Sequence, residues 1–369
     1  MASNTARERN GRLTFQETMS LVSLPDKLSN GKLIKQYMSQ RRPWVPLDDI
    51  LEPNEVRPSG AYGGHVYSQA GMAASRTLAE MQLPSKDGAQ RKKLGIHTMH
   101  GYFSEASFAN RPFVYDVTTI AANPAFYNFL VIARQPLSPS TNAAEDHFPL
   151  ADADLPLGPI CFNALVSFRP SVISQHSAQE PSAQSRFAEI LGSRPPSAWD
   201  PAPLVDIAKI VASLPTREVG SFPIVDMKKV DMSAFNKGKP LHERREIMLY
   251  RLLAPLPAED PDAHILTHAF EADRNGLLMI GNHVGFGFDF GRAASLSYSS
   301  IVHVNPEDAV MSYGENEWWI QEVCFPRVEA GRGLFTSKIW SPNGVHVATE
   351  YQDGIIQRQW KSNERRGKL

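Results

Sequence analysis

The sequence has few features that would commit the chain to redox chemistry or to a membrane. It contains two cysteines in 369 residues, Cys161 and Cys324, and both lie in apolar, strand-like surroundings. Two such thiols predict a reduced intracellular protein with structural cysteines. No apolar run approaches the ~18 residues that a membrane-spanning helix needs. The first residues, MASNTARERNGRL, lack the apolar core of a signal peptide, so we expect an intracellular protein without a membrane span.

An excess of charge of one sign is also absent. Lys and Arg together number 38, Asp and Glu number 39, and the formal net charge is −1. A nucleic-acid-binding surface usually carries an excess of basic residues. No nucleic-acid partner is therefore expected.

Several catalytic motifs are missing or incomplete. No Gly-x-Ser-x-Gly elbow occurs, which argues against a Ser–His–Asp hydrolase. Residues 285–291, GFGFDFG, imitate a dinucleotide-binding glycine run, but the third Gly is one residue late and a strand pattern follows. His264 and His268 have helical spacing, yet no third metal ligand is nearby. We expect no metal and no redox cofactor.

The C-terminus ends in Gly-Lys-Leu, residues 367–369. This ending differs by one residue from Ser-Lys-Leu, a peroxisomal address. The alternative is an ordinary solvated basic tail. The expected location is cytoplasmic, or peroxisomal if the ending is a targeting signal.

The length favours two domains. Residues 136–158 are rich in Pro, Ala, Ser and Asp without periodicity, which predicts a loop insertion. A second stretch of similar composition follows and predicts an interdomain linker. We predict an N-terminal domain over 30–170, a linker over 171–235, and a C-terminal domain over 236–360 that carries the catalytic residues.

The same order of elements occurs in both domains. A helix pattern over Val66–Met81 precedes one set of strand-like runs, and a helix pattern over Asp262–Ile280 precedes another. A helix followed by an antiparallel meander, occurring twice, indicates α+β domains in which each sheet wraps a helix. The closing strands align by eye, and this alignment places Phe168 where Gln352 falls. The strand-like runs are 113–120, 126–134 and 159–168 in the first half, and 293–304, 317–325, 331–340 and 344–352 in the second.

One acid on the second helix pattern needs an explanation. Asp260-Pro261 is a good helix start, with Asp260 as the cap and Pro261 at the first helical position. Asp273 falls on the same helical face as Phe270 and Leu277. A carboxylate placed there would be partly buried and would need partners. It is either a structural acid bound by backbone groups or a desolvated base that activates water.

The stretch VATEYQDGII, residues 347–356, has polar groups on both faces of a predicted strand. At least one face must therefore line something other than hydrocarbon. With period two, one face carries Val347, Thr349 and Tyr351, and the other carries Ala348, Glu350 and Gln352.

Four segments together resemble the acyl-CoA thioesterase II family. In the first half they are SGAYGGHVYSQAGMAA (59–74) and HTMHGYFSEASFANRPFVYDV (97–117). In the second half they are YRLLAPLPAEDPDAHILTHAFEADRN (250–275) and GLFTSKIWSPNGVHVATEYQDGII (333–356). The resemblance covers about residues 45–135 and 245–357, with ordered motifs in both halves.

This resemblance implies a double hotdog fold, in which two tandem repeats each wrap an antiparallel sheet around a long helix. It also implies hydrolysis of acyl-CoA or carrier-bound acyl thioesters by an Asp, a Thr and a Gln that hold the attacking water. The Asp corresponds to Asp273 and the Gln to Gln352. The Thr corresponds to Ser295, which keeps the hydroxyl group.

Substrate contacts are expected from Gly63, Gly64, His65 and Tyr298. A backbone N–H near Gly63-Gly64, at a helix start, would stabilise the oxyanion. A homo-oligomer is compatible with the sequence.

The chain also departs from the family pattern. The family's Ile/Leu-Asp-His-Ser run reads Leu296-Ser297-Tyr298-Ser299 here, and its Arg-Asp-Gly turn is lost at residues 121–129. These changes indicate a divergent member with an altered acyl pocket. Two alternatives stay open: a hotdog dehydratase or isomerase acting on a carrier-bound or polyketide-like intermediate, and a non-catalytic acyl-binding protein.

Overall fold

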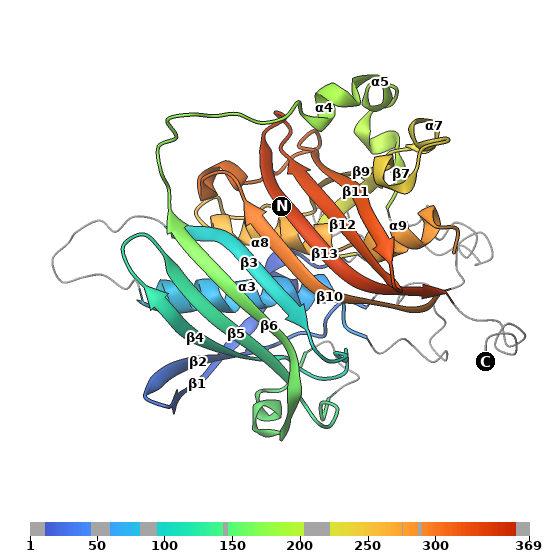
Figure 1. Cartoon of the computed structure of the whole chain (residues 1–369). Helices are drawn as coiled ribbons and strands as arrows, with labels where there is room; N and C mark the ends of the chain where they lie inside the picture. The colour runs from blue at the N-terminus through green and yellow to red at the C-terminus, as the bar shows by residue number, and fades with distance from the viewer. Residues whose placement is uncertain are drawn as a thin grey trace, which may run out of the picture.

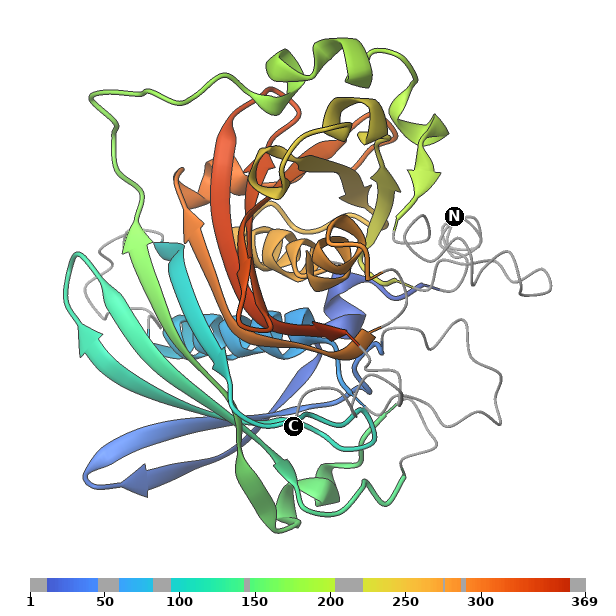
Figure 2. The same cartoon turned by 45° about the vertical axis from the view of Figure 1, so that its right-hand side comes forward.

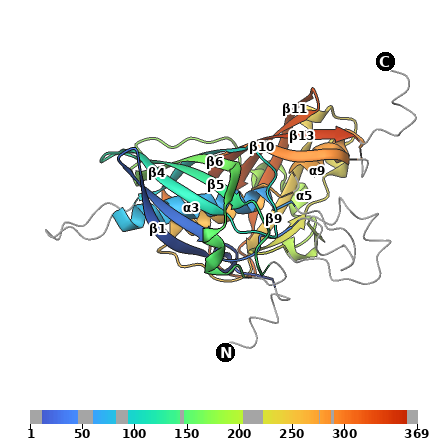
Figure 3. The same cartoon turned by 90° about the horizontal axis from the view of Figure 1, so that it is seen from below.

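Two helices, α3 (Gly63–Met81) and α8 (Pro261–Ala272), lie side by side beneath one curved antiparallel sheet (Figures 1 and 3). The computed structural model describes residues 12–45, 60–81, 94–142, 147–202, 222–274, 276–286 and 290–358. Within these ranges no helix has the length and apolar character needed to cross a membrane. The C-terminal Gly-Lys-Leu lies outside the described residues.

The described strands form a 13-stranded sheet in the order β1-β2-β4-β5-β6-β3-β10-β13-β12-β11-β9-β8-β7. From the centre outward, β3-β6-β5-β4-β2-β1 in one half corresponds to β10-β13-β12-β11-β9-β8 in the other. Each half places its long helix against the inner face of the sheet. This is the double hotdog architecture, an α+β fold, that the resemblance predicted. The strands are β1 (Leu21–Ser29), β2 (Lys32–Ser39), β3 (Leu94–Phe103), β4 (Val114–Ala122), β5 (Tyr127–Pro136), β6 (Leu157–Pro170), β7 (Asp200–Pro201), β8 (Val225–Lys229), β9 (Arg245–Leu252), β10 (Phe290–Val302), β11 (Trp319–Glu329), β12 (Arg332–Trp340) and β13 (His346–Arg358).

The two repeats join through both layers. In the sheet layer, β3 and β10 pair in an antiparallel register, with Gly101 opposite Tyr298. In the helix layer, the Ser68 hydroxyl group of α3 donates to the Leu266 carbonyl of α8 over 3.1 Å. Gly71 allows the close approach, since a Cβ atom there would lie 2.4 Å from Leu266 Cδ2. Pairing the strands removes an exposed edge from each repeat.

We expect Gly71→Leu to lower the free energy of unfolding by about 1–3 kcal/mol or more, because a bulky side chain would push α3 away from α8. Chemical denaturation followed by circular dichroism measures this change. Gly60→Ala is the control, because a Cβ atom there meets nothing within 4 Å. Equal stability of the Gly71→Leu variant and the wild type would contradict the close helix contact.

The second long helix differs from its prediction. The pattern predicted one helix over Asp262–Ile280, whereas α8 ends at Ala272 and a separate helix, α9, spans Gly276–His283. The predicted start is confirmed, because the Asp260 side chain accepts a hydrogen bond from the Ala263 N–H over 3.2 Å. The chain turns between the two helices, and Asp273 is the C-cap of α8. The helical spacing of apolar residues continued through this turn, so the sequence pattern did not indicate the break.

Residues 171–235, predicted as a linker, contain structured elements. The short helices α4 (Ala183–Arg186) and α5 (Ala188–Leu191) lie over the outer face of the second repeat (Figure 2). There Phe187 and Trp199 pack with Trp318 and Trp340 in a second hydrophobic cluster. The same segment also contributes β7 and β8 to the sheet. Its apolar residues bury themselves against the sheet, which low overall periodicity did not indicate.

The N-terminal boundary and the insertion are also informative. β1 lies entirely before residue 30, the predicted start of the N-terminal domain, and pairs with β2. Residues 137–156 connect β5 to β6 and include a 3₁₀ turn, η1, over Leu150–Asp154.

Cys161 is buried, Cys324 is partly buried, and both are free thiols. The domain boundaries at 30, 170, 236 and 360 stay a prediction.

Candidate active site

A cavity of about 440 Å³ lies where the start of α3 meets the turn between α8 and α9. It draws its lining from both repeats, because α3 belongs to the first and the α8–α9 turn, β10 and β13 belong to the second. Its wall combines apolar and polar groups. They include Gly63, Phe103, Asp273, Leu277, Ser295 and Gln352.

Three polar side chains predicted as catalytic meet in this cavity. Gln352, on the inner face of β13, donates from Nε2 to Asp273 Oδ1 and to Ser295 Oγ. Ser295 lies in β10 next to an irregularity in the pairing with β13, between Ser295 and Ser297. Gln352 is 1 % exposed and Asp273 is 8 % exposed. The structure thus brings together residues that lie up to 79 positions apart in sequence.

A backbone donor completes the surroundings of Asp273. The N–H group of Gly64, in the first turn of α3, donates to Asp273 Oδ2 over 2.6 Å. Both carboxylate oxygens therefore accept a hydrogen bond, one from each repeat. A helix N-terminus favours a negative charge placed at this position.

The environment sets the protonation of Asp273. Burial raises the pKa of its carboxyl group to about 6, although the hydrogen bonds from Gln352 and Gly64 and the nearby positive charge of Arg274 oppose that rise. A carboxylate with this pKa is largely ionised at neutral pH and is more basic than an ordinary Asp. That combination is suited to a general base.

Side chains from three separate segments of the chain cap the end of α8. The Ala269 carbonyl accepts from the Tyr298 hydroxyl group over 2.8 Å, and the Phe270 carbonyl accepts from the Tyr62 hydroxyl group over 2.6 Å. Gln321 Nε2 donates to the Ala272 carbonyl over 3.0 Å. These bonds replace intrahelical partners that the last turn of a helix lacks. They fix the position of the next residue, Asp273. The sequence analysis had selected Tyr298 as a substrate contact, but it predicted none of these three bonds.

The predicted substrate contacts are placed unevenly. Gly63 lines the cavity, but the Gly64 N–H is already donated to Asp273. His65 and Tyr298 are fully buried and are not among the lining residues. Burial also lowers the pKa of His65 to about 4, so its ring is neutral. Neither side chain is positioned to touch a ligand in this cavity, because both point into the protein core.

Arg274 is a lining residue that the sequence analysis did not select. Its guanidinium group lies 4.4 Å from the centre of the Trp44 ring and 5.2 Å from that of Phe222. Such stacking holds a cation against an aromatic face. The arginine places a positive charge directly beside Asp273.

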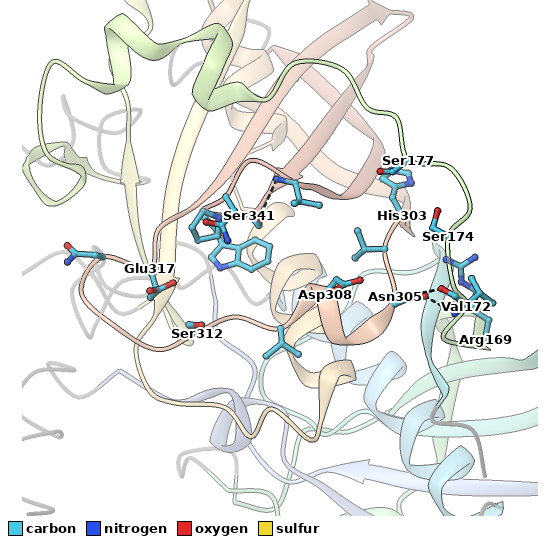
Figure 4. A pocket seen from close by; sticks show the side chains of 17 residues that line it. Arg169, Val172, Ser174, Ser177, His303, Asn305, Asp308, Ser312, Glu317 and Ser341 are labelled. Atoms are coloured by element: carbon cyan, nitrogen blue, oxygen red, sulfur yellow. Dashed lines mark hydrogen bonds between the residues drawn. The ribbon is translucent and has the colours of Figure 1, made fainter. Parts of the chain in front are cut away.

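A second cavity, of about 980 Å³, lies beneath the segment that leaves β6 (Figure 4). Arg169, Asn305, Asp308 and Ser341 are among the groups around it. His303, also on its rim, contacts Thr349 Oγ1 through Nε2 over 2.7 Å. Its carboxylates, Asp308 and Glu317, are at least partly exposed. The smaller cavity, in contrast, is lined by the buried carboxylate of Asp273, and it is therefore the candidate active site.

The described residues contain no group of three or more His, Cys, Asp or Glu side chains arranged to bind a metal ion. His264 and His268 have structural partners instead. His264 Nδ1 accepts from the Met311 N–H over 3.1 Å. His268 lies between the Tyr250 hydroxyl group and the Ala309 carbonyl, at 2.7 and 3.0 Å.

Solved structures share this architecture. An acyl-CoA thioesterase II, TesB2, from Mycobacterium marinum matches with a TM-score of 0.57 and 19% identity, over 95% of this chain and 100% of that one. A tesB protein from Mycobacterium avium subs paratuberculosis gives 0.56 and 17%, over 93% and 98%. A putative thioesterase II from Thermobifida fusca gives 0.55 and 11%, over 94% and 98%. The sequence matches no protein-family model and no curated protein.

The fold and the site together define a double hotdog protein with an Asp–Gln–Ser cluster in a cavity that both repeats line. The predicted resemblance to acyl-CoA thioesterase II is confirmed at the level of the fold, with the low identity of a divergent relative. The reaction has to be argued from the site.

Proposed function

We propose that this protein hydrolyses acyl thioesters, of coenzyme A or of a carrier, to a free acid and a thiol. The observation that carries the proposal is the hydrogen-bonded cluster of Asp273, Gln352 and Ser295 in the cavity. It supplies a base and two positioning groups without a protein nucleophile. A thioester is a good electrophile and does not require one.

In the proposed reaction, water attacks the thioester carbonyl carbon while Asp273 accepts one of its protons. Gln352 Oε1 has no hydrogen-bond partner among the described residues, so it can accept from the same water. Ser295 Oγ accepts from Gln352 and keeps its own proton to donate. The carbon–sulfur bond then breaks, and the proton held by Asp273 passes to the departing thiolate. Positioning and base catalysis together lower the barrier.

The oxyanion would be stabilised by the Gly63 N–H. This donor lines the cavity at the start of a 19-residue helix, and the described residues supply no acceptor for it. The neighbouring Gly64 N–H is occupied by Asp273. A helix N-terminus aimed at a developing negative charge is a common device for this purpose.

A panel of acyl-CoA thioesters tests the proposal, with free thiol measured by a thiol reagent. Thiol release that depends on the acyl chain supports hydrolysis. Substrate loss without thiol release would support the dehydratase or isomerase alternative instead. Saturable binding without turnover would support an acyl-binding protein.

Ser295 and Gln352 should act as one unit. We expect Ser295→Ala and Gln352→Ala each to lower kcat by less than removal of the base does. The double variant should lose less than the product of the two single losses, because both residues position the same water. Steady-state kinetics on the four proteins measures the coupling. Fully multiplicative losses would show that the two side chains act independently.

A further inference from the structure

Two buried groups next to the candidate site take no part in the proposed reaction. Glu350 is 0 % exposed and lies two residues before Gln352, on the same inner face of β13. Tyr298, from β10, is directly opposite Gln352 in the strand pairing. Glu350 and Tyr298 thus place a carboxyl group and a hydroxyl group in the core, where burial is costly unless these groups form hydrogen bonds.

Tyr298 makes two short contacts through its single hydroxyl group. Its oxygen lies 2.6 Å from Glu350 Oε2 and 2.8 Å from the carbonyl oxygen of Ala269. A carbonyl can only accept a hydrogen bond, whereas a phenol has one proton to donate and lone pairs that can accept. Both contacts can be hydrogen bonds at the same time only if the proton of Tyr298 goes to Ala269. The contact with Glu350 is then a hydrogen bond only if Glu350 donates, which requires a protonated carboxyl group.

The surroundings favour the neutral acid. Burial raises the pKa of Glu350 to about 8, partly offset by the hydroxyl groups of Tyr298 and Ser300, and the charge of Asp273 adds to the rise. Glu271 is also buried, and burial raises its pKa well above the ordinary value. Burial raises the pKa of Tyr62, Tyr67 and Tyr250. Glu350 adds to all three of these rises, and Glu271 adds to those of Tyr62 and Tyr250. The titratable groups facing Glu350 are Tyr62 and Tyr67 from the first repeat, Tyr250 from β9, Glu271 and Asp273 from α8 and its cap, and Tyr298 from β10.

The chain of bonds ends at the base. The Ala269 carbonyl belongs to the last turn of α8, and the Asp273 N–H that would normally reach it bonds to the Glu271 carbonyl instead. Tyr298 therefore supplies the donor that this carbonyl would otherwise lack. If Glu350 lost its proton, its carboxylate would attract the Tyr298 proton in a charge-assisted bond. The Ala269 carbonyl would then lose its donor, and a second negative charge would lie near Asp273.

We propose that Glu350 and Tyr298 are positioning residues that form a proton-dependent support for Asp273: protonated Glu350 donates to Tyr298, and Tyr298 donates to the end of α8. Ionisation of Glu350 breaks this support and switches the site off at alkaline pH. The link to catalysis rests on the proposed hydrolysis, whereas the protonation of Glu350 does not.

The protonation is tested without activity. At pH 7 the infrared carbonyl band of protonated carboxylic acids in wild-type protein should contain a component from Glu350 that is lost on raising the pH through about 8, beside any component from Glu271. Glu350→Gln should lack that component, while Glu271→Gln should retain it. A wild-type spectrum identical to that of Glu350→Gln overturns the proposal, whether or not the protein proves to be a thioesterase.

The switch is tested by the pH dependence of kcat/KM on the best substrate of the acyl-CoA panel. The kcat/KM of the wild type should rise through about pH 6 as Asp273 ionises. It should then fall about tenfold per pH unit well above pH 8. Glu350→Gln can still donate to Tyr298 but cannot ionise, so it should keep the rising limb and lose the falling one. Glu271→Gln is the matched control and should keep both limbs.

Tyr298→Phe separates positioning from substrate binding. It leaves the Ala269 carbonyl without its donor, and we expect kcat to fall by roughly ten- to a hundredfold, as when supporting groups are removed around metal ligands. KM should change little, because Tyr298 does not line the cavity.

In the pH profiles of kcat/KM, a falling limb that persists in Glu350→Gln, or that disappears in Glu271→Gln, would overturn the switch.

Discussion

Replacing Asp273 with Asn is expected to lower turnover by about 10²–10⁴-fold, the range typical when a general base is removed. The substitution is nearly isosteric, and an amide can still accept from the Gly64 N–H. It cannot take a proton from water at neutral pH. Activity and thermal unfolding should be measured on the same preparations, so that loss of turnover is separated from loss of folded protein.

Asp262→Asn is the matched control for this variant. Asp262 is also a buried carboxylate of α8, and it accepts from the Ser75 hydroxyl group over 2.6 Å and from the Ile96 N–H over 2.8 Å. It lies at the other end of the helix and does not line the cavity. It should lower stability with little change in turnover per folded molecule. If Asp273→Asn behaves in the same way, Asp273 is a structural acid and the catalytic assignment is wrong.

The second large effect concerns stability at high pH. Glu350 has a pKa of about 8 in the folded protein, against an ordinary value of 4.5. A group whose pKa rises on folding contributes stability that is fully present below its unfolded pKa and is lost as pH increases through the folded value. One pKa unit corresponds to about 1.4 kcal/mol, so the loss between pH 4.5 and pH 8 is on the order of several kcal/mol.

Glu350→Gln removes this titration. We expect it to be about as stable as wild type below pH 4.5 and more stable by several kcal/mol at pH 9, because Gln has no charge to bury. Denaturant unfolding at the two pH values measures the difference. Glu322→Gln should instead lower the free energy of unfolding at pH 9, because Glu322 forms an ion pair with Arg186 that the substitution breaks. A Glu350→Gln variant less stable than wild type at pH 9 would contradict a neutral buried Glu350.

Local patterns in the sequence predicted the start of the second long helix and many of the strands, and the family resemblance pointed to Asp273 as the candidate base. The Asp260-Pro261 start is a short-range signal, and it appears in the structure as an N-cap bond. Alternation of side chains along the strand placed Gln352 on the same face as Ala348 and Glu350, and the family resemblance placed its amide at the site. Ordered motifs in both halves also indicated the double hotdog fold, in which the two halves of the sheet follow the same strand order.

Only the tertiary structure decided where the helix ends and what its end holds. Local periodicity ran through Asp273, but the last carbonyls of α8 bond to Tyr62, Tyr298 and Gln321, which come from distant parts of the chain. The same reason explains Tyr298 and Glu350. Sequence identifies a phenol and an acid, but their roles depend on which atoms lie within hydrogen-bonding distance, and that is set by packing between segments far apart in the chain.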